Sequence, residues 1–173
     1  GFQEKDRRLM NIIRQTAARV RRECGGRDIF ATAENSGANV WFRELGSLKG
    51  FYICENGSRY IIINNALDDI VARTVCAHEL GHDMLHRELS AGGIRENTLF
   101  LANNKTEREA NLFAAEILIT DREALSVLEY AVDIGQVAYE LGVMPEIVEY
   151  KLELLNAAGH SFNVSGAASD FLK

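Results

Sequence analysis

Apolar residues recur every three to four positions over much of the chain, a spacing that predicts amphipathic helices. In residues 4–23 they fall on one side of a helix with arginines on the other, and Gly25-Gly26 marks the end of the pattern. The chain is therefore predicted to be mostly helical. Further helices are expected near 28–33 and over 67–86, 105–118 and 121–156, the last interrupted near 133 and at 142–145.

Three shorter segments, residues 39–43, 50–55 and 59–64, have the pattern of strands. Asn56-Gly57 joins the last two and is a strong hairpin signal. We expect a small antiparallel sheet that directly precedes the 67–86 helix, and hence an α+β fold.

The sequence also predicts how the chain is divided into a core and an appendage, and it indicates one connector and a tail. Residues 1–125 are predicted to form the core, and residues 126–173 a C-terminal helical appendage that packs on it. Residues 88–104 are expected to form a connector that borders the cleft, and the Gly/Ser/Ala-rich tail, 157–169, to be loosely ordered.

The motif HELGH, residues 78–82, lies within the 67–86 pattern, and His78-Glu79-x-x-His82 matches a zinc-peptidase pattern. On a helix, residues four apart are about 40° apart around the axis and one turn apart along it, so both imidazoles can bind one ion. The alternative is a surface helix that carries two histidines by chance. The apolar faces of the surrounding helix and the mid-helix position of the pair favour the metal site.

Glu79 is rotated by about 100° from His78, so it flanks the ion instead of binding it. We expect it to be the general base for a water molecule whose pKa zinc lowers to about 7. His86 lies about 12 Å from His78 along the axis, too far to bind the same ion easily. It is predicted either to contact a ligand or the substrate, or to be a plain packing or solvated side chain. It is also the one candidate for an oxyanion-stabilising donor.

A catalytic zinc site usually has three protein ligands and a water, so a further ligand is required. A ligand could fold back from just after HELGH if position 85 were a glycine and position 88 a ligand, but the residues there are Leu85 and Glu88. A later element must therefore supply the third ligand. On the 105–118 helix Glu107 and Asn111 share a face, while Glu109 points almost opposite. Glu107 is the predicted third ligand, Glu109 the alternative, and Asn111 a partner that orients an imidazole.

Other side chains near the motif have structural interpretations. Ala114 and Ala115 would let the 105–118 helix approach the HELGH helix closely. Glu109, if not a ligand, and Glu116 are expected on a solvated face, and Cys76 is expected to be a small buried side chain.

HELGHDMLH, followed 21 residues after its last histidine by EREANLFAAEIL, resembles the ImmA/IrrE family of zinc-dependent metallopeptidases. The resemblance covers residues 50–120 and implies a zincin-like, gluzincin-type site in which a carboxylate on a second helix is the third ligand. Within Glu-x-x-Ala-Asn that ligand maps to Glu107. One departure is that family members often have a proline just after the second helix, whereas the single proline here is Pro145.

Composition narrows the function classes. The 173 residues, 47% of them hydrophobic, are enough for one domain with a core. Three separated cysteines without a CxxC pair indicate neither a disulfide framework nor a thiolate zinc site. The charged N-terminus and the lack of an apolar stretch approaching about 18 residues predict a cytoplasmic protein with no membrane partner.

A net charge of −6 argues against a general nucleic-acid binder. Residues 1–23 carry +4, and their basic face is either a site for an acidic partner or, as we prefer, solvated. Residues 133–156 have the helix, glycine turn, helix pattern of a helix-turn-helix, but five acidic residues stand there against Lys151, a net charge of −4. Phosphate contacts need the opposite sign, so a helical cap is predicted and DNA binding is the alternative.

The predicted function is a zinc-dependent endopeptidase with one zinc per chain, held by His78, His82 and Glu107. Such a ligand set also accepts other divalent metals. The substrate is expected to be a specific cytoplasmic protein, because a short chain with a small sheet is poorly suited to bulk digestion, and the family resemblance implies a helix-turn-helix repressor. The alternative is a non-catalytic metal-binding regulatory protein that acts through protein or DNA binding. Glu79 favours the enzyme, since a structural zinc site needs no base.

Overall fold

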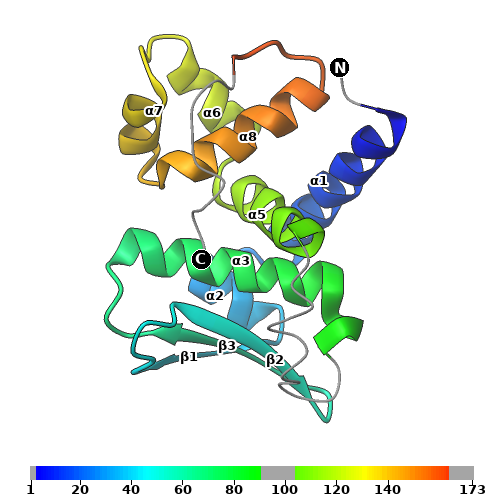
Figure 1. Cartoon of the computed structure of the whole chain (residues 1–173), viewed down its shortest axis with the longest axis vertical. Helices are drawn as coiled ribbons and strands as arrows, with labels where there is room; N and C mark the ends of the chain where they lie inside the picture. Colours follow the sequence, from blue (N-terminus) through cyan, green and yellow to red (C-terminus); the bar gives the residue numbers. More distant parts are fainter. Residues whose placement is uncertain (1–2, 91–103, 164–173) are drawn as a thin grey trace.

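The computed structural model describes residues 3–90 and 104–163, which form an α+β fold with a three-stranded sheet (Figure 1). Most of the connector predicted at 88–104, residues 91–103, lies outside the described residues, as do residues 164–169 of the tail predicted at 157–169. The first part of the chain contains α1 (Glu4–Cys24), α2 (Ile29–Asn35), β1 (Asn39–Arg43), β2 (Gly50–Glu55) and β3 (Ser58–Asn64). The second part contains α3 (Asp69–His86), η1 (Arg87–Ser90), α5 (Asn104–Leu118), α6 (Asp121–Leu128), α7 (Ile134–Leu141) and α8 (Pro145–Ala157).

The sheet has the order β1-β3-β2 and is mixed, so the prediction of an antiparallel sheet was wrong. β2 and β3 form the expected antiparallel hairpin, with Asn56 and Gly57 at φ 50° and 80° in the turn. β1 pairs with β3 in parallel. The chain reverses direction twice between β1 and β3, and β3 lies between the other two strands, so its neighbours run in opposite directions.

The helix that carries HELGH packs directly on the hairpin. α3 contacts β2 and β3, while α2 contacts β1 and α3 (Figure 1). Gly50 makes the close approach of β2 possible, because a Cβ there would lie 2.5 Å from Val75 Cγ1 and 2.8 Å from the Ile62 carbonyl oxygen. Farther along α3, the buried Asp83 carboxylate accepts hydrogen bonds from Tyr52 (2.6 Å) and Arg59 (2.6 Å), which lie on the two hairpin strands. These contacts fix α3 on the sheet on both sides of the motif.

α5 is the central helix of the other layer and packs against α3, α1 and α8 (Figure 1). The predicted close approach of this helix to α3 is confirmed, and the contact lies at Gly81 and Ala110, where a Cβ on Gly81 would be 3.1 Å from Ala110 Cα. Ala114 and Ala115, which were expected to permit the approach, are fully buried. α5 is thus held in register with HELGH.

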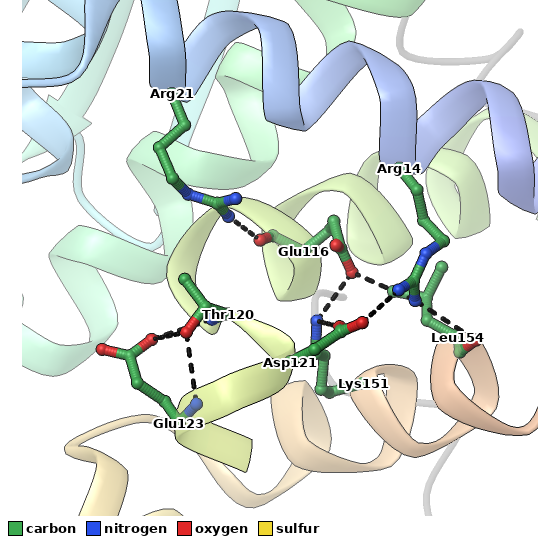
Figure 2. Close-up of polar contacts among 8 residues, drawn as sticks. All are labelled: Arg14, Arg21, Glu116, Thr120, Asp121, Glu123, Lys151 and Leu154. Atoms are coloured by element: carbon green, nitrogen blue, oxygen red, sulfur yellow. Dashed lines mark hydrogen bonds and ion pairs between the residues drawn. The ribbon is translucent and has the colours of Figure 1, made fainter. Parts of the chain in front are cut away.

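A buried charge network joins α1, α5, α6 and α8 (Figure 2). Lys151 is 1% exposed, and its Nζ lies 2.7 Å from Glu116 Oε2 and 2.7 Å from Asp121 Oδ1. Arg14 of α1 adds an ion pair to Asp121 and donates to the Leu154 carbonyl at 3.4 Å. Glu116 was expected on a solvated face, and that prediction was wrong because Lys151 reaches it from α8.

The last three helices follow the predicted breaks. Asp133 caps α7 by accepting from the Gln136 amide at 2.7 Å, Gly142 ends α7 in the left-handed region at φ 62°, and Pro145 begins α8. Buried residues of all three helices belong to the same hydrophobic core as the rest of the described chain. The predicted division into a core and an appendage after residue 125 stays a prediction.

Among residues 3–90 and 104–163, the structure contains no helix with the length and apolar character needed to cross a membrane.

Candidate metal centre

α3 and α5 bring His78, His82 and Glu107 together. The two Nε2 atoms are 3.1 Å apart. Glu107 Oε2 lies 3.1 Å from His78 Nε2, and Glu107 Oε1 lies 3.1 Å from His82 Nε2. The distances follow from the helical spacing of the histidines and from the contact that places the start of α5 over the motif.

This arrangement fits a zinc ion. With ligand bonds of about 2.0–2.1 Å and tetrahedral geometry, two ligand atoms lie about 3.3 Å apart. The observed separations of 3.1 Å are close to this value. Three ligands from the protein are also the number that catalytic zinc sites use, with the fourth position left for water or substrate.

The electrostatics of the site favour a cation. Burial alone would raise the pKa of Glu107, but its hydrogen bonds to His78 and His82 outweigh burial and hold the pKa well below its usual range. Burial lowers the pKa of His78, yet the Glu107 hydrogen bond and the charges of Glu79 and Glu107 leave that pKa raised. The raised pKa of His78 indicates surroundings that favour positive charge, and the lowered pKa of Glu107 keeps its carboxylate ionised beside the two imidazoles.

A side-chain amide fixes the orientation of His78. Its Nδ1 lies 2.7 Å from Asn111 Oδ1, and Asn111 Nδ2 donates to the Tyr150 hydroxyl at 3.2 Å. Because an amide oxygen only accepts, His78 donates from Nδ1 in this contact, and its Nε2 faces Glu107 and His82. Asn111 thus has the position expected for an orienting partner. Tyr150 on α8 was not anticipated, since its only signal is spatial proximity.

His82 has a different neighbour. Its Nδ1 lies 3.2 Å from His86 Nδ1, and His86 Nε2 lies 2.7 Å from Glu109 Oε2. Burial lowers the pKa of His86, partly offset by the hydrogen bond to Glu109. His86 is 9% exposed and Glu109 8% exposed, so the solvated face expected for Glu109 was wrong. The signal that could have found this contact is the one-turn spacing of His82 and His86, which places a third imidazole where α5 covers α3.

Glu79 is half-buried and has no hydrogen-bond or ion-pair partner among the described residues. Its charge nevertheless contributes to the raised pKa of His78, so the carboxylate is close to the site electrostatically. A carboxylate next to the ligands and not engaged by another protein group can accept a proton from a water molecule.

Comparisons with known proteins point in the same direction. The model of a peptidase family described as the IrrE N-terminal-like domain matches residues 33–153, which include HELGH and Glu107. The chain is 35% identical over 104 residues, 60% of its length and 65% of the relative's, to "Uncharacterized immunity region protein 2" of Bacillus phage phi105. It is 33% identical over 85 residues, 48% of its length and 50% of the relative's, to "Metallopeptidase ImmA" of Bacillus subtilis (strain 168). The chain therefore matches between half and two thirds of each curated relative.

Proposed function

The chain belongs to the ImmA/IrrE family, the peptidases with an IrrE N-terminal-like domain, and on that basis we propose that it is a zinc-dependent endopeptidase with a zincin-like site. His78, His82 and Glu107 hold one zinc per chain. The observation that carries the proposal is the cluster in which the Nε2 atoms of His78 and His82 lie 3.1 Å apart and each lies 3.1 Å from one carboxylate oxygen of Glu107, beside the unengaged carboxylate of Glu79. A structural zinc site would need no such carboxylate.

The residues divide the chemistry between them. Zinc, when bound, supplies a Lewis acid that polarises a carbonyl and lowers the pKa of water to about 7. Glu79 accepts the proton of the attacking water at its carboxylate and passes it to the leaving amine when the peptide bond breaks. Asn111 keeps the proton of His78 on Nδ1, so that Nε2 remains a ligand.

β2 is the strand that we assign to substrate binding. Among the residues that the structure describes, it is an edge strand of the sheet. It runs along α3 from the Gly50–Val75 contact to the Tyr52–Asp83 hydrogen bond, with HELGH between them. The hydrogen bond of 2.8 Å from the Asn64 amide to the Lys49 carbonyl sets the phase of the β2–β3 ladder. Residues 51, 53 and 55 therefore face β3, and the backbone groups of Gly50, Tyr52 and Cys54 face outward. An extended peptide segment can pair with these groups and lie beside the metal site.

The substrate in this proposal is a helix-turn-helix repressor in the cytoplasm, and its cleavage relieves repression. Two relatives support the assignment, since one is named for an immunity region and the other is named a metallopeptidase. The small sheet fits a specific target that offers one accessible extended segment. The structure further weakens the alternative of DNA binding by residues 133–156. Lys151, the one basic residue in that segment, is buried and paired with Glu116.

The experiment is incubation of the zinc-loaded protein with the repressor encoded beside it, followed by mass spectrometry of the fragments. We expect one or a few cleavage sites in an extended segment of the repressor, loss of cleavage with a chelator, and little digestion of casein. Rapid digestion of casein would instead indicate a general protease. Cleavage that requires another divalent metal and fails with zinc would contradict the assignment of zinc.

A further inference from the structure

The two histidines of the metal centre have partners of different charge. His78 faces the neutral amide of Asn111, whereas His82 faces His86, which in turn faces the carboxylate of Glu109. We propose that Glu109 and His86 are positioning residues that fix His82 as an Nε2 ligand through two consecutive hydrogen bonds. The proposal rests on the metal site of the proposed function and adds a role for Glu109.

The direction of these hydrogen bonds follows from the donor capacity of each group. An ionised carboxylate only accepts, so His86 Nε2 donates to Glu109 Oε2 over 2.7 Å. A neutral imidazole then has its lone pair on Nδ1, and His86 Nδ1 accepts from His82 Nδ1 over 3.2 Å. His82 consequently carries its proton on Nδ1 and its lone pair on Nε2, the atom that lies 3.1 Å from Glu107 Oε1. The opposite direction would place the proton on Nε2 and remove the lone pair that the metal needs.

Burial favours the hydrogen bond between His86 and Glu109 over hydrogen bonds from these groups to water. His86 and Glu109 are both more than nine-tenths buried, so water does not compete well for their polar atoms. The second oxygen of Glu109, Oε1, is buried without a hydrogen-bond partner among the described residues, and the exposed ammonium of Lys105 lies 3.8 Å away. The one hydrogen bond of this carboxylate in that part of the chain is therefore directed at His86.

The unequal partners have a consequence for metal binding. A carboxylate behind an imidazole makes it a more basic ligand, and loss of such an outer partner typically weakens metal binding by about 10–100-fold. His82 receives this support through His86, while His78 receives only the orientation that an amide provides. Loss of Glu109 should therefore lower zinc affinity although the three ligands are intact.

Two readouts test the proposal without an activity assay. The first is the tautomer of His82, read from the 15N chemical shifts of its ring nitrogens in the full-length protein at a pH of about 8, where imidazoles are neutral. The second is zinc affinity, measured by competition with a chromophoric chelator. In wild-type protein before zinc addition, we expect the proton of His82 on Nδ1. A proton on Nε2 in this sample would overturn the proposal without any variant.

Variants then separate the hydrogen bond from the charge. Glu109→Gln can still accept from His86, so the Nδ1–H tautomer of His82 should persist while zinc affinity falls. Glu109→Leu can accept nothing, so we expect a mixture of tautomers and a loss of zinc affinity of about 10–100-fold. Glu129→Gln, which makes the same change at an exposed glutamate after α6, is the control and should leave both readouts at their wild-type values.

The proposal is overturned if Glu109→Leu keeps both the Nδ1–H tautomer and the zinc affinity of wild-type protein. If Glu109→Leu does not fold, the wild-type tautomer and the affinity of Glu109→Gln decide the question. These results do not depend on peptide cleavage. A wild-type protein that binds zinc with the expected tautomer but cleaves nothing would contradict the proposed function and leave the role of Glu109 standing.

Discussion

Glu107 and Glu109 lie two positions apart on α5 and contact different histidines of α3. Glu107 lies 3.1 Å from both His78 and His82, whereas Glu109 lies 2.7 Å from His86. Residues two apart on a helix differ by about 200° in direction, so one carboxylate cannot replace the other without rotation of α5. The site therefore depends on the rotational setting of α5 as well as on the presence of a glutamate.

The first prediction separates the two glutamates. Glu107→Ala should lose stoichiometric zinc, because two imidazoles remain where a catalytic site needs three protein ligands. Glu109→Ala should still contain zinc when the metal is in excess, since it retains all three ligands. Elemental analysis of both variants after gel filtration measures this. If Glu107→Ala contained a full complement of zinc and Glu109→Ala contained none, Glu109 would be the zinc ligand and the assignment of Glu107 would be wrong.

At the scale of the elements, the contact between α3 and α5 sets the distance between the histidines and Glu107. Gly81 lies within the motif, and a Cβ added there would meet Ala110 Cα and its carbonyl oxygen at 3.1 Å and Phe113 Cδ1 at 3.2 Å. Alanine at this position can be accommodated only if the helices separate by a few tenths of an ångström. Glu107 lies in the first turn of the same helix, so that movement reaches the candidate metal site.

The second prediction follows from this contact. Gly81→Ala should destabilise the protein by about 1–3 kcal/mol through overpacking, offset by up to about 1 kcal/mol of improved helix propensity, and should also weaken zinc binding. Gly135→Ala in α7 is the comparison, because a Cβ there would meet only the exposed Asp133 side chain, at 3.2 Å from Oδ1, and it should change stability less than Gly81→Ala and leave zinc binding unchanged. Urea denaturation and zinc titration of both variants provide the measurement. A Gly81→Ala protein with wild-type zinc affinity would show that α5 does not depend on this contact.

The local sequence pattern predicted the bounds of most helices and strands, but it did not predict which elements contact or pair with one another. The segment predicted as a strand over 39–43 is β1 with those same bounds, and the Asn56-Gly57 hairpin is present. The parallel pairing of β1 with β3 was missed because it depends on the path of residues 44–49, which no local signal specifies. Glu109 and Glu116 were misplaced for a similar reason, since their partners lie on other helices.

The ligand geometry was more accessible to sequence reasoning than the groups behind it. HExxH spacing on a helix places two imidazoles on one side, and the facing of Glu107 and Asn111 on a second helix follows from the helical period. The partners Tyr150 and Glu109 depend on how α8 packs on α5 and how α5 packs on α3, and that packing is a tertiary property. Tyr150 shows that the candidate site extends beyond α3 and α5 to a third helix, α8.

At the scale of the whole molecule, the network around Lys151 joins helices from both ends of the described chain (Figure 2). Burial tends to raise the pKa of Asp121, but the hydrogen bond from Lys151 and the charges of Lys151 and Arg14 outweigh it and lower the pKa. A carboxyl group whose pKa is lower in the folded protein stabilises the fold above its unfolded pKa of about 3.9. That contribution is lost as the pH falls through the folded pKa.

The third prediction uses this sign. Asp121→Asn should be less stable than wild type at neutral pH. The difference should begin to shrink as the pH falls below about 4, where Asp121 becomes protonated in the unfolded protein, and should vanish below the lower pKa of the folded protein. Denaturant titrations at several pH values measure the difference. Asp69→Asn, at an exposed pair with Arg73, should show a smaller effect of either kind. A difference between Asp121→Asn and wild type that stays constant with pH would contradict the assigned charge pairing.

The substitution Glu79→Gln, compared with wild type at equal zinc content, tests the account most directly. The amide cannot accept a proton from water, so the variant should bind zinc and fold normally but should not cleave the repressor. Elemental analysis, circular dichroism and a time course of repressor fragments at matched zinc occupancy provide the result. Cleavage at the wild-type rate by Glu79→Gln would remove Glu79 as the base, and an intact repressor bound stably by both proteins would contradict the enzyme and favour a non-catalytic regulatory role.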